Sequence, residues 1–222
     1  MLDLVHVVRE AAGEPAGALI LLHGRGADEH DLVPMLDELD PERRLVGLTP
    51  GAPLPGPGGM GGRWWYMVPR VGYPDPATFH ATYAQLTSFL DGWLQERGIP
   101  WTRTVIGGFS MGCAMSYATG LGPGRPSPAG ILAMSAFIPT VERWQPELDT
   151  RADLPVFIAH GSRDPVISVQ FARDARRRLE SAGLDVDYHE HQGGHHIDHR
   201  ALPPMTAWVA ARFAQGRAPV SD

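Results

Sequence analysis

Short apolar runs that alternate with longer amphipathic stretches limit most strongly how this chain can fold. Several runs, such as Ala18–Leu22 and Val156–Ala159, are apolar at every position rather than at every second one. Continuous apolar strands are expected where helices cover both faces of a sheet, because neither face meets water. Helices between the strands imply crossover connections, and therefore neighbouring strands that run parallel. The pattern predicts an α/β fold, with a mostly parallel central sheet flanked by helices on both faces.

The expected elements follow from the apolar periodicity and from the residues that end each stretch. The predicted strands are Leu4–Arg9, Ala18–His23, Leu45–Leu48, Thr104–Phe109, Gly130–Ser135, Pro155–His160 and Asp185–His191. The predicted helices are Glu29–Leu39, Ala77–Arg97, Met111–Thr119, Val169–Ala182 and Pro204–Gln215. Gly120 and Gly183 follow two of these helices, where glycine commonly ends a helix. The first and last strands alternate more in polarity, which indicates the two edges of the sheet.

A long segment, Pro50–Pro76, carries neither a helix nor a strand pattern. It is dense in glycine and proline but also holds several aromatic residues, which argue against disorder. We therefore expect it to fold over a cleft. The whole chain, residues 1–222, is expected to form one domain. A typical domain has ~150 residues, but a single α/β domain can be larger than that.

The amino-acid composition argues against several classes of function for this chain. The formal net charge is −6, which argues against a broad nucleic-acid-binding surface. All 19 basic residues are arginine, so a Schiff-base lysine and a Ser–Lys dyad are excluded. The apolar runs are far shorter than the ~20 residues that a membrane span needs. Cys113 is the lone cysteine, and Met1-Leu2-Asp3 does not begin a signal-peptide pattern, so we expect a cytoplasmic protein.

The sequence Gly108-Phe109-Ser110-Met111-Gly112 is a G-x-S-x-G pattern between a predicted strand and a predicted helix. In that context the serine lies on a strained turn that exposes its Oγ at the edge of the sheet. Side chains at the two glycine positions would collide with the neighbouring strand and helix. The positive end of the helix would stabilise an oxyanion. Ser110 is therefore the predicted nucleophile, whereas Cys113 is expected to pack within its helix as a small buried residue.

A serine hydroxyl needs a general base, and in this kind of fold an acid and then a histidine follow the serine along the chain. Asp164 lies in the loop after the buried strand Pro155–His160, at the strand end where open α/β sheets place their sites. Asp164 is therefore predicted to orient the base. An ordinary surface-turn aspartate is the alternative.

The base is expected in Gln192–Ile197, which follows the last strand and contains two adjacent histidines. Turn geometry after a Gly-Gly pair favours His195 over His196, whose role stays open. Four histidines outside the cluster near the C-terminus are expected to be packed or structural: His6, His23, His80 and His160.

Histidines at 189, 191, 195, 196 and 199 raise the alternative of a metal-dependent hydrolase. Residues 196–199 match the second half of an H-x-H-x-D-H metal pattern, but Gly194 occupies its first position. No histidine follows His199 to complete a second site, and a zinc site normally needs three or four ligands held together. We therefore expect no catalytic metal. A non-catalytic binding module on the same fold is the other alternative.

A tetrahedral intermediate needs two backbone N–H donors aimed at its oxygen. Met111, directly after the nucleophile, is expected to provide one of them. The other is expected from the loop His23–Asp28, whose glycines permit close approach of the backbone to a substrate.

Five motifs follow one another in the chain: His23–Asp28, Pro50–Pro53 with the tryptophan-rich segment after it, Gly107–Gly112, His160–Val166 and Gly194-His195. With these motifs the sequence resembles the phospholipase/carboxylesterase family of α/β-hydrolases, which includes acyl-protein thioesterases. The resemblance implies a triad of Ser110, Asp164 and His195, with oxyanion N–H groups from Arg25 and Met111. It also implies an enzyme without a large cap domain that hydrolyses carboxylic esters or thioesters without a cofactor.

The residues expected to wall an apolar substrate pocket beside Ser110 are Trp64, Trp65, Tyr66, Phe137 and Ile138, with completion of the core as the alternative. The predicted function is that of a serine hydrolase that cleaves carboxylic esters, thioesters or lysophospholipids through an acyl-enzyme intermediate. A small-molecule ester or thioester is the expected partner. Leu54–Gly62 is richer in glycine and proline than the family pattern, so acyl specificity does not follow from the resemblance. The natural substrate and a homodimer stay open.

Overall fold

A seven-stranded sheet forms the centre of the protein in the computed structural model, which describes residues 3–59 and 61–214. The strand order across this sheet is β1-β3-β2-β6-β7-β8-β9. The strands are β1 (His6–Arg9), β2 (Ala18–Leu22), β3 (Val46–Pro50), β6 (Thr104–Phe109), β7 (Gly130–Met134), β8 (Pro155–Gly161) and β9 (Asp185–His191). Neighbouring strands pair in parallel, except that β1 runs antiparallel to β3. The predicted, mostly parallel sheet with the first and last strands at its edges is therefore confirmed.

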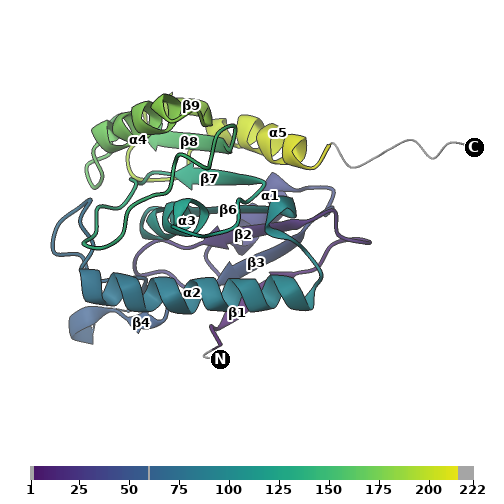
Figure 1. The fold of residues 1–222 in the computed structure, drawn as a ribbon, viewed down its shortest axis with the longest axis horizontal. Helices are drawn as coiled ribbons and strands as arrows, with labels where there is room; N and C mark the ends of the chain where they lie inside the picture. The colour runs from purple at the N-terminus through teal and green to yellow at the C-terminus, as the bar shows by residue number, and fades with distance from the viewer. Residues whose placement is uncertain (1–2, 60, 215–222) are drawn as a thin grey trace, which may run out of the picture.

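Helices cover both faces of this sheet (Figure 1). They are α1 (Val33–Leu39), α2 (Pro76–Glu96), α3 (Met111–Leu121), α4 (Val169–Ser181) and α5 (Leu202–Arg212), with short 3-10 turns η1 (Pro57–Gly59), η2 (Trp101–Arg103) and η3 (His199–Ala201). One buried cluster contains residues of α2, α3 and α4, and the other contains residues of α1 and α5. Along β2, Ile20 and Leu22 belong to the first cluster, whereas Leu19 and Leu21 belong to the second. Burial on both faces is why this strand is apolar at every position.

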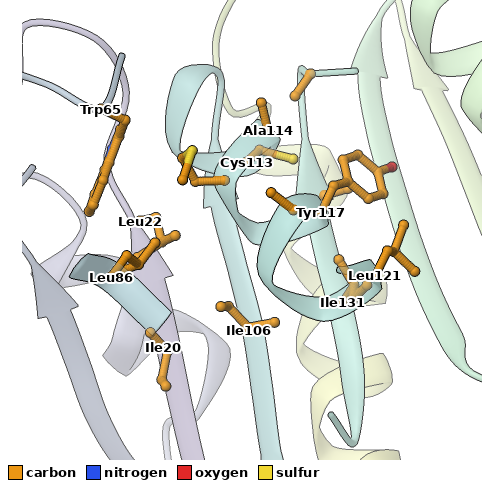
Figure 2. Packing of buried hydrophobic residues seen from close by; sticks show 14 of the residues in the cluster. Ile20, Leu22, Trp65, Leu86, Ile106, Cys113, Ala114, Tyr117, Leu121 and Ile131 are labelled. Atoms are coloured by element: carbon orange, nitrogen blue, oxygen red, sulfur yellow. The ribbon is translucent and has the colours of Figure 1, made fainter. Parts of the chain in front are cut away.

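Helix α3 packs on the middle of the sheet (Figure 2). Its residues Cys113 and Tyr117 belong to the same buried cluster as Ile106 of β6 and Ile131 of β7. Cys113 is fully buried, as expected, and burial raises the pKa of its thiol. The thiol therefore stays protonated, and the side chain packs as a small apolar residue.

The end of α3 differs from the prediction. The helix runs through Gly120 to Leu121, so the prediction that Gly120 ends it is wrong. A Cβ atom at Gly120 would lie 2.7 Å from Ile131 Cδ1, which means that this glycine lets the helix approach β7 closely. Gly183, with a φ of +83°, does follow the end of α4 as predicted.

The start of α1 and the last predicted helix also differ from expectation. Helix α1 begins at Val33 rather than at Glu29, because the Asp28 carboxylate accepts a backbone N–H two residues later and so favours a turn there. The predicted helix Pro204–Gln215 is observed as α5. Gln215, like Met1 and Leu2 at the other end of the chain, lies outside the described residues.

The segment Pro50–Pro76, predicted as a loop, holds two short antiparallel strands, β4 (Leu54–Pro55) and β5 (Arg63–Trp64). Each contributes only two residues, which is too short for a periodic pattern to predict. None of the helices within the described ranges is long and apolar enough to cross a membrane.

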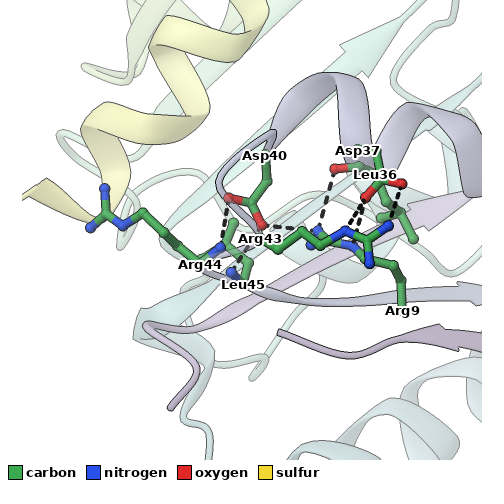
Figure 3. Close-up of polar contacts among 7 residues, drawn as sticks. All are labelled: Arg9, Leu36, Asp37, Asp40, Arg43, Arg44 and Leu45. Carbon is green, nitrogen blue, oxygen red and sulfur yellow. Dashed lines mark hydrogen bonds and ion pairs between the residues drawn. The ribbon is translucent and has the colours of Figure 1, made fainter. Parts of the chain in front are cut away.

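A buried ion pair joins the first strand to the end of α1 (Figure 3). The Arg9 guanidinium donates to Asp40 Oδ2 at 2.9 Å, and the two side chains are only 6% and 7% exposed. Asp40 also accepts the backbone N–H groups of Arg44 and Leu45, at 3.0 and 2.9 Å. This carboxylate therefore holds the turn between α1 and β3 and compensates a buried positive charge.

Replacing this carboxylate should destabilise the protein far more than replacing its exposed neighbour. Asp40→Ala leaves a buried guanidinium and two backbone N–H groups without their partner, so we expect the free energy of unfolding to fall by ~3–5 kcal/mol. Asp37→Ala removes a carboxylate that is 47% exposed and 3.6 Å from Arg9 Nε, and should cost less than ~1 kcal/mol. Urea denaturation measures both losses, and equal values would contradict the role of Asp40.

Candidate active site

Ser110 lies on a sharp turn between β6 and α3. Its φ and ψ angles are 54° and −117°, a conformation that residues other than glycine rarely adopt. The Ser110 N–H donates to Met134 O at 2.9 Å, which holds the turn against β7. A Cβ atom at Gly108 would lie 2.5 Å from Leu22 O, and one at Gly112 would collide with the same oxygen. The steric reason predicted for these two glycines is therefore observed.

The structure brings the Ser110, Asp164 and His195 side chains together. His195 Nε2 lies 2.8 Å from Ser110 Oγ, and His195 Nδ1 lies 2.6 Å from Asp164 Oδ2. The three residues follow strands β6, β8 and β9. Because these strands run parallel, their carboxyl ends meet at one edge of the sheet, and residues 85 positions apart in the sequence touch.

The surroundings of Asp164 keep its carboxyl group ionised. Burial by itself would raise its pKa, but the Ile167 and Val166 N–H groups donate to Oδ1 at 2.8 Å each, and His195 donates to Oδ2. Together these bonds bring the pKa of Asp164 below its ordinary value. An ionised Asp164 places the ring hydrogen of His195 on Nδ1, so the Nε2 lone pair faces the Ser110 hydroxyl. The arrangement allows the serine to give its proton to His195.

His160 is completely buried beside this carboxylate. Its Nε2 donates to Ile167 O at 2.8 Å and lies 3.4 Å from Asp164 Oδ2. Burial lowers the pKa of His160, which keeps the ring neutral. The residue is packed, as expected, but its contact with the Asp164 loop was not predicted. Its place on the strand directly before that loop is the signal that could have indicated it.

Arg25 and Met111 line the cavity beside Ser110. Neither backbone N–H has a hydrogen-bond partner among residues 3–59 and 61–214. The loop that carries Arg25 is held by Arg63, whose carbonyl accepts the Gly26 N–H at 3.0 Å. Two unpaired N–H groups beside the Ser110 hydroxyl are what the predicted oxyanion hole requires.

His23 joins this loop to the residues after β3. Its Nδ1 donates to Gly24 O at 2.7 Å, and its Nε2 accepts the Ala52 N–H at 3.0 Å. Burial lowers the pKa of His23, so the ring stays neutral and both bonds persist at pH 7. His23 was predicted to be a packed histidine, and the structure adds that it supports the Arg25 loop.

A cavity of about 230 Å³ lies beside the Ser110 hydroxyl. The larger apolar side chains in its lining are Tyr66, Val68, Val71, Phe109, Met111, Phe137, Val166 and Ile167. Tyr66 and Phe137 were predicted to lie there. The valines and Ile167 were not, because isolated apolar residues in loops carry no periodic signal. The predicted loop over a cleft is observed in part, since Tyr66, Val68 and Val71 belong to it.

The expectation that Trp64, Trp65 and Ile138 line the same cavity is wrong. Ile138 lines a neighbouring cavity instead. Trp65 is fully buried, its indole N–H donates to His23 O at 2.9 Å, and its backbone N–H contacts Met111 Sδ at 3.2 Å. Figure 2 shows its ring in the core cluster beside Leu22. Trp64 is buried as well, with the Arg25 guanidinium 5.1 Å above its ring. Both tryptophans therefore pack behind the Arg25 loop instead of facing the cavity.

The remaining histidines of the cluster near the C-terminus lie apart from the triad. The exposed His196 gathers with His191 and Asp198, and the three side chains each offer a ligand atom within 4.8 Å of the others. His189 pairs with Asp187 at 2.7 Å instead. His196, whose role the sequence left open, therefore does not share the contacts of His195 with Asp164 and Ser110.

Comparisons with known proteins agree with this geometry. A sequence model of the phospholipase/carboxylesterase family matches residues 4–211. An acyl-protein thioesterase 1 from Debaryomyces hansenii is 27% identical over 220 residues, covering 88% of this chain and 91% of that protein. An acyl-protein thioesterase 1 from Cryptococcus neoformans is 30% identical over 165 residues, covering 70% of this chain and 69% of that protein.

Solved structures show the same fold. A Bacillus cereus carboxylesterase superposes with a TM-score of 0.81 at 22% identity, covering 94% of each chain. The esterase PE8 superposes with a TM-score of 0.78 at 25% identity, covering 95% of this chain and 99% of that one. The fold is that of the α/β-hydrolases, and the protein is an enzyme of the hydrolase class. Since the family model spans nearly all of the described residues, the chain belongs to the phospholipase/carboxylesterase family.

Proposed function

We propose that the protein hydrolyses carboxylic esters and thioesters through an acyl-enzyme intermediate on Ser110, with His195 as the general base and Asp164 as its orienting partner. The observation that carries this proposal is the continuous chain of hydrogen bonds from Asp164 through His195 to Ser110, at 2.6 and 2.8 Å, beside a cavity. The names of the family and of its acyl-protein thioesterase relatives support the substrate class. Lysophospholipids contain the same carboxylic ester bond.

In the first half of the reaction, His195 Nε2 takes the Ser110 proton while Oγ attacks the carbonyl carbon of the substrate. The carbonyl oxygen becomes an oxyanion, which the Arg25 and Met111 N–H groups bind. Collapse of this intermediate breaks the bond to the leaving group. His195 gives its proton to the departing alkoxide or thiolate, and the acyl group stays on Ser110.

In the second half, water takes the place of the leaving group. His195 removes a proton from this water, whose oxygen attacks the acyl carbon, and the proton then passes to Ser110 Oγ as the carboxylic acid leaves. Asp164 compensates the positive charge that His195 carries in both halves. None of these steps requires a cofactor.

Removal of the nucleophile should abolish hydrolysis without unfolding the protein. We expect Ser110→Ala to lower kcat for p-nitrophenyl acetate by at least about 10⁴-fold, because the variant lacks the hydroxyl that would take up the acyl group. Circular dichroism should show an unchanged fold. Hydrolysis by Ser110→Ala at the wild-type rate would refute the assignment. If a chelator then abolished the hydrolysis by Ser110→Ala, the metal-dependent alternative would be favoured.

A change of one atom in the orienting residue tests the role of Asp164 separately. Asp164→Asn keeps the shape of the side chain but removes its charge and permits the wrong tautomer of His195, so we expect a loss of about 10⁴-fold in kcat. The measurement is the steady-state rate at pH 7, with titration by a serine-directed phosphonate to count competent sites. A loss below tenfold would show that Asp164 does not orient the base.

Phe137 lies between the cavity beside Ser110 and a second cavity of about 210 Å³, since it lines both. Phe137→Ala should join the two spaces. We therefore expect the ratio of kcat/KM for p-nitrophenyl octanoate to that for the butyrate to rise about tenfold. Ile138→Ala is the matched control, because Ile138 lines the second cavity but not the first. An unchanged ratio in Phe137→Ala would place the acyl chain elsewhere.

A further inference from the structure

The side chains of His191, His196 and Asp198 converge on the segment that carries His195, outside the triad. Each offers one ligand atom, and these atoms lie within 4.8 Å of one another. Within residues 3–59 and 61–214, no other group of three or more histidine, cysteine or acidic side chains converges in this way. Of the five histidines in this stretch, His191 and His196 therefore come together, whereas His189 pairs with Asp187 instead.

One distance within the group already matches zinc coordination. His191 Nδ1 lies 3.3 Å from Asp198 Oδ2. Two ligand atoms that bind zinc tetrahedrally, each at ~2.0–2.1 Å, stand about 3.3–3.4 Å apart. His191 Nδ1 accepts the Gly193 N–H at 3.1 Å, so this nitrogen is unprotonated. A zinc ion on Nδ1 would take the place of this hydrogen bond.

Gly193 provides the room in which the two imidazoles approach each other. A Cβ atom at this position would lie 2.7 Å from His191 Nδ1 and 2.8 Å from His196 Nε2. Any side chain here would therefore push the rings apart. The exposed His196 can adjust its position, whereas the His191 and Asp198 side chains are only 10% and 7% exposed and are held in place.

Asp198 is already oriented for a cation. Its Oδ1 accepts the Arg200 backbone N–H at 2.8 Å, while Oδ2 faces both His191 and the Arg200 guanidinium, the latter at 2.6 Å. The Arg200 side chain is 75% exposed, so it can turn into solvent when another cation takes its place. The pair is exposed on its arginine side only, so a divalent cation that replaces the guanidinium would keep the Asp198 charge compensated.

We propose that His191, His196 and Asp198 bind a zinc ion, with water in the fourth position. Two imidazoles and one carboxylate are ligands that zinc prefers over magnesium or calcium. His195 is not a ligand, because its two ring nitrogens contact Asp164 and Ser110. His191 ends β9 and Asp198 caps η3, so the ion would fasten both ends of the segment that carries His195.

Isothermal titration calorimetry of the full chain without a polyhistidine tag tests the site. We expect one Zn²⁺ per chain, no binding of Mg²⁺, and a melting temperature that rises with Zn²⁺, because a ligand that binds the folded state stabilises it. Ser110→Ala should bind Zn²⁺ as the wild type does, since the site does not depend on hydrolysis. Failure of wild-type protein to bind Zn²⁺ would overturn the proposal.

Substitutions locate the ion. His196→Ala and Asp198→Asn should each weaken Zn²⁺ binding by at least about tenfold. His199→Ala removes another exposed histidine of the same stretch and should leave the affinity unchanged. His196 is exposed, so its loss should not unfold the protein, and circular dichroism checks this. Equal weakening by His196→Ala and His199→Ala would mean that zinc binds the histidines of this stretch without a defined site.

Discussion

The contact between the Ser110 turn and strand β2 is the constraint on which the rest of the site depends. The turn can approach β2 because Gly108 and Gly112 place no side chain against Leu22 O. Ser110 thereby keeps its φ of 54° and extends Oγ toward His195. The same contact brings the loop after β2, which includes Arg25, beside the first turn of α3. A single backbone packing contact therefore places both the nucleophile and the N–H groups proposed to bind the oxyanion.

Buried side chains around this contact act as supports. Trp65 joins His23 O to the Met111 side chain, and His23 joins the Arg25 loop to Ala52. On the other side of the site, His160 supports the Asp164 loop through its hydrogen bond to Ile167 O. A neutral imidazole suits this task because one nitrogen donates while the other can accept. His195 differs from the other two, since it lines the cavity and its Nε2 meets Ser110 there.

Predictions succeeded where a short stretch of chain decides the outcome. Apolar runs located the strands because a strand covered on both faces is apolar throughout. The G-x-S-x-G pattern located Ser110 because the strained serine and its two glycines lie within five consecutive residues. Predictions failed where a contact with a residue far away in the sequence decides the local structure. Gly120 was expected to end a helix, yet it makes room for Ile131. No pattern marked the Arg9–Asp40 pair, because neither charge differs locally from charges that lie on the surface.

By itself, the sequence determined the alternation of strands and helices, the serine turn, and the order in which Ser110, Asp164 and a histidine follow one another. Each of these depends on neighbours along the chain. Tertiary structure decided that Trp65 supports a loop while Tyr66 lines the cavity, and that His196 joins Asp198 instead of the triad. Those outcomes depend on how strands far apart in the sequence pair and on where each loop side chain then points, and no short stretch of residues contains that information.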